Sequence, residues 1–385
     1  MSKKLIALTL ATVLVAGLIT AGATASGKQS RAGRSFSVGI YDDGMTLGNP
    51  DKGFPILHNL RAQIVRITLW WGGPIGVVGA KRPKTPTDPA DPAYNWSNYD
   101  RAVQDAAKYK IKVLFSIVGT PSWANGGKGM RIAPTRPADL KNFATAAARR
   151  YNGAFKDADG NVLPAVHLWL AWNEPNNPVF LAPQYKKVHG HYIALSAYNY
   201  VRICNAIYGG VHAVQHGAAK VACGGTDPRG NNQPKSRRAS ISPLAFLRLS
   251  KRYGLRRFDA WAHHPYASRP SESPLSKPKA KTVVILGNIG DLTKEVTRLY
   301  GRKPIWITEY GYQTRPPDRT FGVAWKTQAK YLAQSFAIAR KNPRIQMMIW
   351  FLVKDESRLA GWQSGFFTSA GKRKPSYYAF RALKH

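Results

Sequence analysis

Short apolar segments alternate with amphipathic segments along most of the chain. Eight apolar segments have the length and composition of buried strands, and they lie at 36–41, 64–70, 112–118, 166–172, 220–224, 258–264, 304–309 and 347–353. Apolar residues recur with helical spacing between them, at 98–109, 137–151, 183–208, 243–253, 283–300 and 322–341, and in a last segment at 375–383. The connection after the first strand has only a weak helical pattern, at 54–62. The pattern therefore predicts a regular alternation of strands and helices.

Eight strands separated by helices in a chain of 385 residues fit an α/β fold, the (β/α)8 TIM barrel. A doubly wound open sheet is the alternative. That fold usually has a glycine-rich phosphate-binding turn after its first strand, and residues 39–44 do not form this motif. Three strand-to-helix connections are long, at 72–96, 225–242 and 267–281. Because such loops surround the active site of a barrel, we expect them to build a cleft.

The first residues have the pattern of a secretory signal peptide. Lys3 and Lys4 precede an apolar run at 5–19, and small residues suited to cleavage follow at 23–25. An uncleaved membrane anchor is the alternative, because the apolar run is nearly long enough to span a bilayer. We expect a signal peptide at 1–25, one domain at 26–385, and a secreted protein without stable membrane insertion after cleavage.

The chain contains two cysteines, Cys204 and Cys223. In an exported protein they could form one disulfide, and two buried free thiols are an equally good interpretation. The sequence contains no CxxC, no Cys/His cluster and no HExxH motif. It therefore suggests no metal site.

The net charge is +37, from 57 Lys and Arg against 20 Asp and Glu. This excess makes nucleic acid, acidic cell-wall polymers and acidic polysaccharides candidate partners. No zinc finger, aromatic RNA-binding signature or basic zipper pattern accompanies the charge, so we expect no specific nucleic-acid partner. A solvated basic surface that keeps the protein soluble is the simpler interpretation.

Two glutamates stand where apolar segments give way to polar residues. Glu174 follows the segment 166–172 in LWLAWNEPNNP, and Glu309 is the last residue of the segment 304–309 in PIWITEYGYQT. In a barrel these segments would be the fourth and seventh strands, so both carboxyls would lie at C-terminal strand ends. Two carboxyls that meet there can cleave a glycosidic bond, because one protonates the leaving oxygen and the other attacks or stabilises the sugar carbon.

The sequences WNEPN and ITEYG together resemble the clan of retaining (β/α)8 glycoside hydrolases, which includes the cellulase-like family 5 and the xylosidase-like family 39. The resemblance covers nearly all of the chain after the signal segment. It implies that Glu174 is the acid/base and that Glu309 is the nucleophile. It also implies that Asn173 holds the sugar 2-hydroxyl, and that the reaction needs no metal or organic cofactor.

Three further residues match the clan by position. Arg66, in the second strand, falls where the clan has an arginine close to the nucleophile, and a permanent cation there would lower the pKa of Glu309. The sequence AHHPY places His264 and Tyr266 on the clan's His-x-Tyr pattern. Tyr266 would hydrogen-bond Glu309, and His264 would contact the sugar or order the site. His263 has the opposite strand parity and is expected to face away.

Two tryptophans are candidates for sugar contacts. Trp350 falls where the clan has an aromatic platform under the reacting sugar, since flat rings pack against the C–H face of a pyranose. Trp123 lies in GTPSWANGG at the end of the third strand, a sequence closer to the family 39 pattern than to that of family 5. Both could instead belong to the hydrophobic core.

The sequence therefore predicts a secreted retaining glycosidase that acts on the β-linkages of a polysaccharide or oligosaccharide, with acidic glycans among the candidate substrates. Transglycosylation would use the same residues. Two non-enzymatic alternatives remain, a carbohydrate-binding barrel without catalysis and a basic exported protein that binds anionic polymers. The second would bind in a salt-dependent way that needs neither glutamate.

Overall fold

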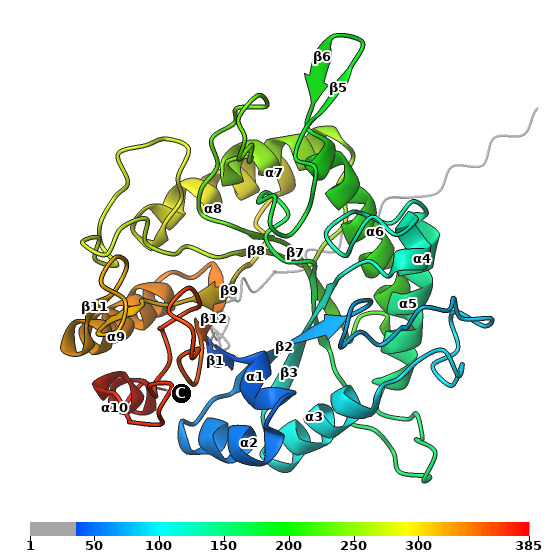
Figure 1. Cartoon of the computed structure of the whole chain (residues 1–385), viewed down its shortest axis with the longest axis horizontal. Coiled ribbons are helices and arrows are strands. Elements are labelled where there is room, and N and C mark those ends of the chain that lie inside the picture. The colour runs from blue at the N-terminus through cyan, green and yellow to red at the C-terminus, as the bar shows by residue number, and fades with distance from the viewer. Residues whose placement is uncertain (1–35, 385) are drawn as a thin grey trace, which may run out of the picture. The chain divides into compact units, whose positions relative to one another are not determined.

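The computed structural model describes residues 36–384, so the predicted signal peptide lies outside the described residues. Eight parallel strands close into a barrel in the order β1, β2, β3, β4, β7, β8, β9, β12 (Figure 1). Their bounds are β1 Ser37–Tyr41, β2 Ile64–Trp70, β3 Lys112–Val118, β4 Leu168–Ala171, β7 Lys220–Thr226, β8 Ala260–His263, β9 Ile305–Tyr310 and β12 Ile345–Phe351. The predicted TIM barrel is confirmed.

A ring of helices surrounds the barrel (Figure 1). The helices that follow the eight strands are α2 Pro50–Asn59, α3 Ser97–Lys108, α5 Pro137–Arg150, α6 Leu195–Gln215, α7 Pro243–Arg252, α8 Ile289–Tyr300, α9 Trp325–Lys341 and α10 Pro375–Arg381. Four of them have proline in the first turn, where no intrahelical partner for an N–H is lost. Among the described residues, no helix is long and apolar enough to cross a membrane.

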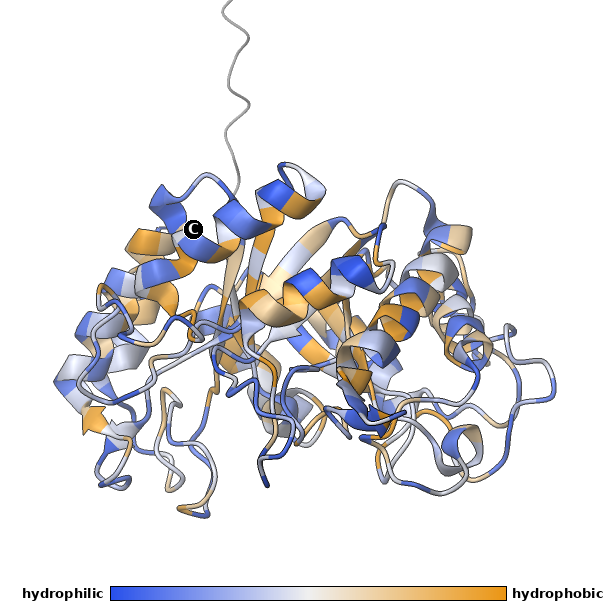
Figure 2. Cartoon of the chain, turned by 90° about the horizontal axis from the view of Figure 1, so that it is seen from above, coloured by the Kyte–Doolittle hydropathy of each residue, from blue (hydrophilic) through white to orange (hydrophobic). Residues whose placement is uncertain are grey.

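Short elements interrupt several of the connections. They are the helices α1 Asp43–Thr46 and α4 Ser122–Asn125, the 3-10 turn η1 Leu286–Asn288, and the strands β5 Lys186–Val188, β6 His191–Ile193, β10 Thr314–Arg315 and β11 Val323–Ala324. The antiparallel hairpin of β5 and β6 projects beyond the ring of helices (Figure 1). Long loops gather at one end of the barrel, in the lower half of Figure 2.

Some predicted helix bounds were wrong. The helix expected at 183–208 begins only at Leu195 and continues to Gln215, because the hairpin occupies its first part. Gly190 turns that hairpin with a φ of 83°, a conformation that a helix does not contain. The weak pattern at 54–62 belongs to a complete helix, α2, which starts earlier at Pro50.

Apolar side chains form two layers of core. The barrel interior is filled by Ile64, Leu114, Leu170, Ala222, Ala260, Ala262, Trp306, Met347 and Ile349. A larger cluster lies between the outer face of the strands and the helices, and it contains Trp169, Trp261 and Trp350. Figure 2 shows the resulting pattern, with apolar segments on the central strands and on the inner sides of helices. Successive residues of a strand belong to alternate layers, as the pleat requires.

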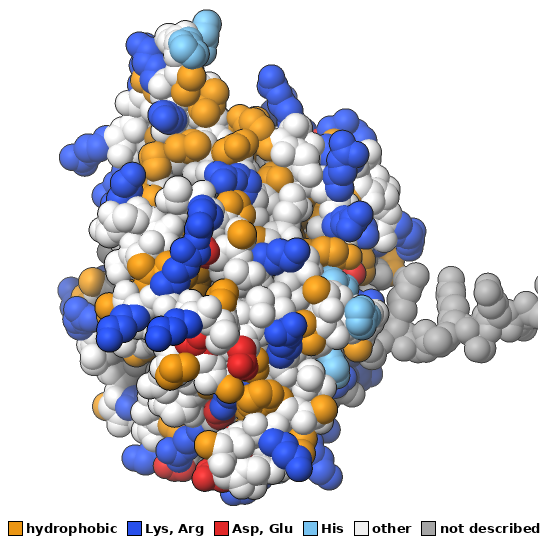
Figure 3. Space-filling model, turned by 90° about the vertical axis from the view of Figure 1, so that its right-hand side faces the viewer, with side chains coloured by type: hydrophobic (Ala, Val, Ile, Leu, Met, Phe, Trp, Pro, Cys, Tyr) orange, Lys and Arg blue, Asp and Glu red, His pale blue; other side chains and the backbone are white. Residues whose placement is uncertain are grey.

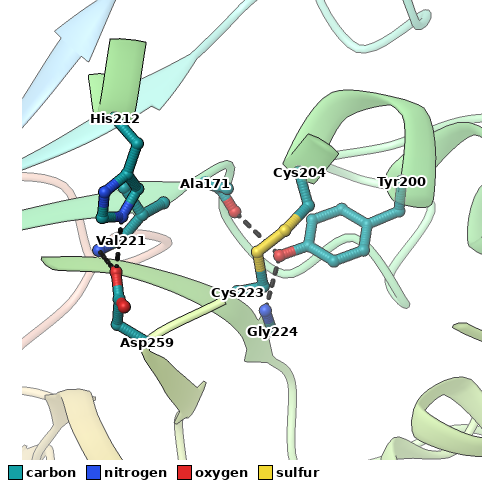
Figure 4. Close-up of a disulfide and its surroundings, with 8 residues drawn as sticks. All are labelled: Ala171, Tyr200, Cys204, His212, Val221, Cys223, Gly224 and Asp259. Carbon is teal, nitrogen blue, oxygen red and sulfur yellow. Dashed lines mark hydrogen bonds and ion pairs between the residues drawn. A yellow bond between two sulfur atoms is a disulfide. The ribbon is translucent and has the colours of Figure 1, made fainter. Parts of the chain in front are cut away.

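A disulfide joins Cys204 of α6 to Cys223 of β7, with a Cα–Cα distance of 6.1 Å (Figure 4). The sequence had left this bridge and two free thiols as equal alternatives. The neighbouring Tyr200 hydroxyl donates to the carbonyl of Ala171 at 3.0 Å and accepts from the N–H of Gly224. Helix α6 is therefore tied covalently to β7 and by hydrogen bonds to the ends of both β4 and β7.

Candidate active site

Glu174 lies in the loop that follows β4. The strand ends at Ala171, one residue earlier than predicted, and two residues that are not glycine then adopt positive φ angles, 66° at Trp172 and 37° at Glu174. The N–H of Glu174 donates to the carbonyl of Gly225 at 2.8 Å. Left-handed backbone is costly for such residues and is frequent at functional sites. The turn is thus held to β7 and directs the Glu174 carboxyl over the barrel mouth.

Glu309 lies within β9, which extends to Tyr310, so the prediction that it ends the strand was wrong by one residue. The pairing of β9 with β12 contains an irregularity here: Ile307 pairs with Met348, and Tyr310 pairs with Trp350. Two residues of β9, Thr308 and Glu309, therefore stand opposite one residue of β12. Such a bulge redirects side chains. It lets Thr308 and Glu309 both point into the barrel mouth.

The two glutamates line one cavity of about 490 Å³. A carboxyl oxygen of Glu174 lies within 4.8 Å of a carboxyl oxygen of Glu309. The cavity is bounded by the loops that follow β4, β7, β8, β9 and β12, together with Tyr41 at the end of β1. The end of the barrel that carries it is the one that βα loops surround in a TIM barrel.

Arg66 connects the strands beneath this cavity. Its side chain is 0% exposed, and its Nη1 donates to Glu309 Oε2 at 2.9 Å and to the carbonyl of Thr308 at 3.1 Å. Nε donates to Ser116 Oγ at 2.8 Å. The guanidinium also lies 4.3 Å from the centre of the Tyr41 ring. A buried cation needs such partners, and here they fix it against Glu309.

Asn173 and Tyr266 complete the contacts around Arg66 and Glu309. Arg66 Nη2 donates to Asn173 Oδ1 at 2.7 Å, and because a guanidinium can only donate, this contact fixes the orientation of the amide. The Asn173 Nδ2 group then has no partner among the described residues, and the side chain lines the cavity. The Tyr266 hydroxyl donates to Glu309 Oε1 at 2.9 Å, as the sequence predicted.

His264 orients Glu174. Its Nε2 faces Thr308 Oγ1 at 3.0 Å and the guanidinium of Arg66 at 3.5 Å, and the second of these can only donate. Nε2 is therefore the acceptor, and Nδ1 carries the proton that it donates to Glu174 Oε1 at 2.9 Å. Burial, followed by the charge of Arg66, holds the pKa of His264 well below its usual range, so the ring is neutral.

The pKa of both glutamates is raised, with burial as the largest cause, and that of Glu174 is raised well above its ordinary value. The negative charges of Asp227 and Glu309 raise the pKa of Glu174 further. For Glu309, Arg66 and the Tyr266 hydroxyl oppose the effect of burial. The prediction that Arg66 lowers the pKa of Glu309 gave its contribution correctly but missed that burial outweighs it. Of the pair, Glu174 holds a proton more firmly.

The structure corrects two predicted sugar contacts. Met347 and Ile349 of β12 point into the barrel, so Trp350 points outward, is 0% exposed and packs near Phe366 and Tyr310. It does not line the cavity. Trp123 also lies outside the cavity lining and contacts Trp71 and Arg82 instead.

Arg66 and His264 were also candidates for substrate binding, and for His264 the alternative was a role in ordering the site. Both are completely buried and neither lines the cavity, so a direct contact with substrate is not supported. They position the glutamates from beneath. His263 faces away from the carboxyls, as expected, and contacts Thr226 and the carbonyl of Val284.

Sequence reasoning identified only Tyr266 among the four rings that form an aromatic wall of the cavity. Tyr41, Phe351, Trp362 and Tyr266 line it, and consecutive rings in this series lie 5.2, 5.5 and 5.0 Å apart. Phe351 follows the predicted Trp350, so the alternation of β12 could have identified it. Trp362 lies in the loop after β12, where no periodic pattern predicts its direction.

A buried ion pair fixes the loop that carries Trp362. The Lys374 ammonium is 0% exposed, and it donates to Asp355 Oδ1 at 2.8 Å, to Thr314 Oγ1 at 2.8 Å and to the carbonyl of Gln363 at 3.1 Å. Asp355 Oδ1 also accepts from the N–H of Gly365 at 2.9 Å. The charges therefore hold both ends of the loop, on either side of Trp362.

Glu174, His264 and Glu309 each offer one ligand atom, and these atoms lie within 4.8 Å of one another, a spacing that a metal ion could use. The hydrogen bonds that these side chains already make do not suit metal binding. Both oxygens of Glu309 accept hydrogen bonds, from Tyr266 and from the Arg66 cation. His264 Nδ1, which would have to be unprotonated to bind a metal, faces Glu174 as a donor. The cluster is better suited to handling protons.

Residues 277–378, which include Glu309, match a family model described as glycosyl hydrolase catalytic core. This part of the chain is therefore similar to the catalytic core of glycosyl hydrolases. No curated protein sequence matches it.

Solved structures of glycoside hydrolases share its fold. A family 39 glycoside hydrolase from the gut symbiont Bacteroides cellulosilyticus WH2 aligns with a TM-score of 0.58 and 17% identity, over 90% of this chain and 63% of that one. A glucosidase from Croceicoccus marinus aligns with a TM-score of 0.64 and 15% identity, over 90% of this chain and 67% of that one. A family 39 enzyme from Xanthomonas axonopodis pv. citri aligns with a TM-score of 0.60 and 16% identity, over 91% of this chain and 67% of that one. The chain thus spans about two thirds, or less, of these neighbours.

Proposed function

We propose that this enzyme is a secreted, retaining glycoside hydrolase that cleaves β-linkages of a polysaccharide or oligosaccharide, with Glu174 as acid/base and Glu309 as nucleophile. The observation that carries the proposal is the short separation of the two carboxyls. Retaining glycosidases have carboxyl groups about 5–5.5 Å apart, whereas inverting enzymes leave about 6.5–9.5 Å for a water molecule. The oxygens within 4.8 Å of each other support the first geometry.

In the first step, Glu309 attacks the anomeric carbon while Glu174 gives its proton to the departing glycosidic oxygen. The bond from the anomeric carbon to the leaving oxygen breaks, and an ester bond to Glu309 forms. The arrangement suits these roles, because Arg66 and Tyr266 stabilise charge on Glu309 and burial keeps Glu174 protonated. The free Nδ2 of Asn173 is placed to donate to the sugar 2-hydroxyl.

In the second step, water attacks the anomeric carbon and Glu174 removes its proton. Formation of the ester removes the negative charge of Glu309, which had raised the pKa of Glu174, while the cation of Arg66 remains. The pKa of Glu174 therefore falls when it has to act as a base. His264 keeps its hydrogen bond to Glu174 Oε1 in both steps, so Oε2 is the oxygen that exchanges the proton.

Two features support secretion and an acidic substrate. A disulfide between Cys204 and Cys223 is typical of proteins that fold in an oxidising compartment, which agrees with the predicted signal peptide. The net charge of +37 favours association with an acidic glycan through long-range attraction.

The test combines activity with stereochemistry. The protein without residues 1–25 is assayed on aryl β-glycosides and on neutral and acidic β-glycans, together with Glu309→Gln, Glu174→Gln and a control, Glu295→Gln, which lies on α8 outside the cavity. Proton NMR of the first product should show the β-anomer before mutarotation. Both site variants should lose several orders of magnitude in kcat, and the control should not. An α-anomeric first product, or equal rates for wild type and Glu309→Gln, would refute the mechanism.

A further inference from the structure

Two arginines at the cavity have no protein partner. Arg229, in the loop after β7, and Arg269, in the loop after β8, both line the cavity that contains Glu174 and Glu309. Both are exposed, and neither guanidinium makes a hydrogen bond or an ion pair with any described residue. Arg66, in contrast, uses all of its nitrogens on protein acceptors. The two exposed side chains therefore keep their donors free.

The backbones of these arginines are nevertheless held in place. The N–H of Arg229 donates to Asp227 Oδ1 at 2.7 Å, and its carbonyl accepts from Asn176 Nδ2 at 3.3 Å. The N–H of Arg269 donates to Glu272 Oε2 at 3.1 Å. Each arginine thus projects from an anchored position. Both oxygens of Asp227 accept hydrogen bonds, Oδ1 from the N–H of Arg229 and Oδ2 from Asn177 Nδ2 at 2.9 Å, and the charge of Arg229 lowers the pKa of Asp227 without a direct ion pair.

Arg229 lies across the cavity from Tyr41 and Phe351, and Arg269 lies in the loop after β8 that also carries Tyr266. In the barrel order, β4, β7 and β8 are neighbours, and β1 faces β7 while β12 faces β4 across the barrel. Tyr41 and Phe351 come from the β1 and β12 side, whereas Glu174 and Arg229 come from the β4 and β7 side. The positive charge of Arg229 also reaches Glu174, whose pKa it lowers. If Glu174 protonates the leaving oxygen, Arg229, which lies on the same side of the cavity as Glu174, faces the leaving group.

We infer that Arg229 and Arg269 form a subsite for an anionic group, a carboxylate or a sulfate, on the sugar that leaves, and that they make the enzyme selective for acidic glycans. This inference rests on the proposed function, because it takes Glu174 as the acid. Two N–H donors at the edge of each planar guanidinium match the two oxygens of a carboxylate. They can bind a substrate only if they are not already bonded to protein acceptors. The aromatic wall then receives the sugar that becomes bonded to Glu309.

The general positive charge of the surface would not by itself select an acidic leaving sugar. Lys and Arg side chains are spread widely over the face drawn in Figure 3, where carboxylates are few. Such a surface attracts any polyanion without discriminating among linkages or positions. Selection of the leaving sugar requires cations inside the cavity, and Arg229 and Arg269 supply them.

The experiment uses disaccharides that differ only in the leaving sugar. Glucose, galactose or xylose is β-linked to glucuronic acid, to glucose 6-sulfate or to glucose, and kcat/KM is measured for wild type, Arg229→Gln, Arg269→Gln and the double variant. Arg302→Gln is the matched control, because Arg302 is exposed in the connection from α8 to β9, at the other end of the barrel. Aryl β-glycosides, which have no leaving sugar, report the catalytic groups alone.

Wild type should prefer the anionic members of a set by at least about tenfold, the order expected for a charge-assisted hydrogen bond at a solvent-exposed site. The double variant should lose this preference. Rates on aryl glycosides and on neutral disaccharides, each taken at the pH optimum of the variant, give the basal activity with which the loss is compared, because Arg229 also lowers the pKa of Glu174. The carboxylate and sulfate members show which anion is recognised. Equal rates on neutral and anionic members, or a preference that the double variant retains, would overturn the inference and leave the proposed function intact. Failure on aryl glycosides and on every disaccharide would instead overturn the proposed function.

Discussion

Replacement of Arg66 by methionine tests the electrostatic design of the site. The variant keeps an unbranched side chain in the barrel but removes the cation that contacts Glu309 at 2.9 Å. For charge centres about 4 Å apart and an effective dielectric constant of about 20, the lost attraction is about 4 kcal/mol. That corresponds to about a thousandfold change in the acid dissociation constant of Glu309. The pKa of Glu309, already raised by burial, should rise further.

The assay is the pH dependence of kcat/KM on an activated aryl glycoside. The acid limb reports ionisation of the nucleophile, so it should move to higher pH in Arg66→Met. The basic limb, which reports loss of the proton from Glu174, should move less, because Arg66 ranks below burial, Asp227 and Glu309 among the influences on that pKa. The bell should therefore become narrower and lower, with the largest loss of activity, up to about a thousandfold, on its acid side.

The control is Arg150→Met, since Arg150 is also buried and paired with a carboxylate, Asp100, but lies outside the cavity. Loss of one partner of a buried pair costs about 3–5 kcal/mol in stability, so both variants should melt at lower temperature. Only Arg66→Met should change the pH profile. A profile of Arg66→Met that is lower than wild type at all pH values, with both limbs in place, would refute the assigned role and leave Arg66 as a structural residue.

Three other predictions concern the titrating groups and the disulfide. Glu174→Gln should raise Tm at pH 8 but not at pH 4. Because the folded protein raises the pKa of Glu174, ionisation of this carboxyl destabilises the fold. That cost grows as the pH rises from the ordinary pKa of 4.5 to the raised pKa, and it is absent at pH 4. Calorimetry at the two pH values checks this, and equal shifts at both would contradict it. Asp227→Asn should move the basic limb of the rate profile to lower pH, because it removes a negative charge that raises the pKa of Glu174. A limb that does not move would mean that Asp227 has no part in setting this pKa. The double change Cys204→Ala and Cys223→Ala should lower the free energy of unfolding by about 3 kcal/mol in urea titrations, as expected for a closed loop of this length. Two reactive thiols in wild-type protein that is unfolded without a reductant would contradict the disulfide.

The barrel and the two glutamates could be predicted because both leave local signals. Strands of a parallel barrel are covered on both faces, so they appear in the sequence as short apolar segments without polar interruption. A carboxylate directly after such a segment is conspicuous, and this was the case for Glu174 and Glu309. Arg66 stood out for a related reason, since a charge inside an apolar strand needs a buried partner.

The remaining features depend on geometry that no local pattern contains. The inward direction of Glu309 results from the bulge in β9, and the bulge is visible only in the pairing with β12. The resemblance to the clan indicates Trp350, whereas the alternation of β12 brings Phe351 to the cavity. Arg229 belongs to a long loop, and whether such a residue lines the cavity is decided by anchors far away in sequence, such as Asn176.

The pair Lys374–Asp355 has a consequence for synthesis of the protein. Domains fold as units while the chain leaves the ribosome from the N-terminal end, and Glu174, Glu309 and Arg66 are all made before β12. The barrel cannot close until β12 pairs with β1, and the wall at Phe351 and Trp362 cannot be fixed until Lys374 arrives. A nascent chain that already contains both glutamates therefore has no finished cavity. Completion of the catalytic site therefore has to wait for the synthesis of β12 and Lys374.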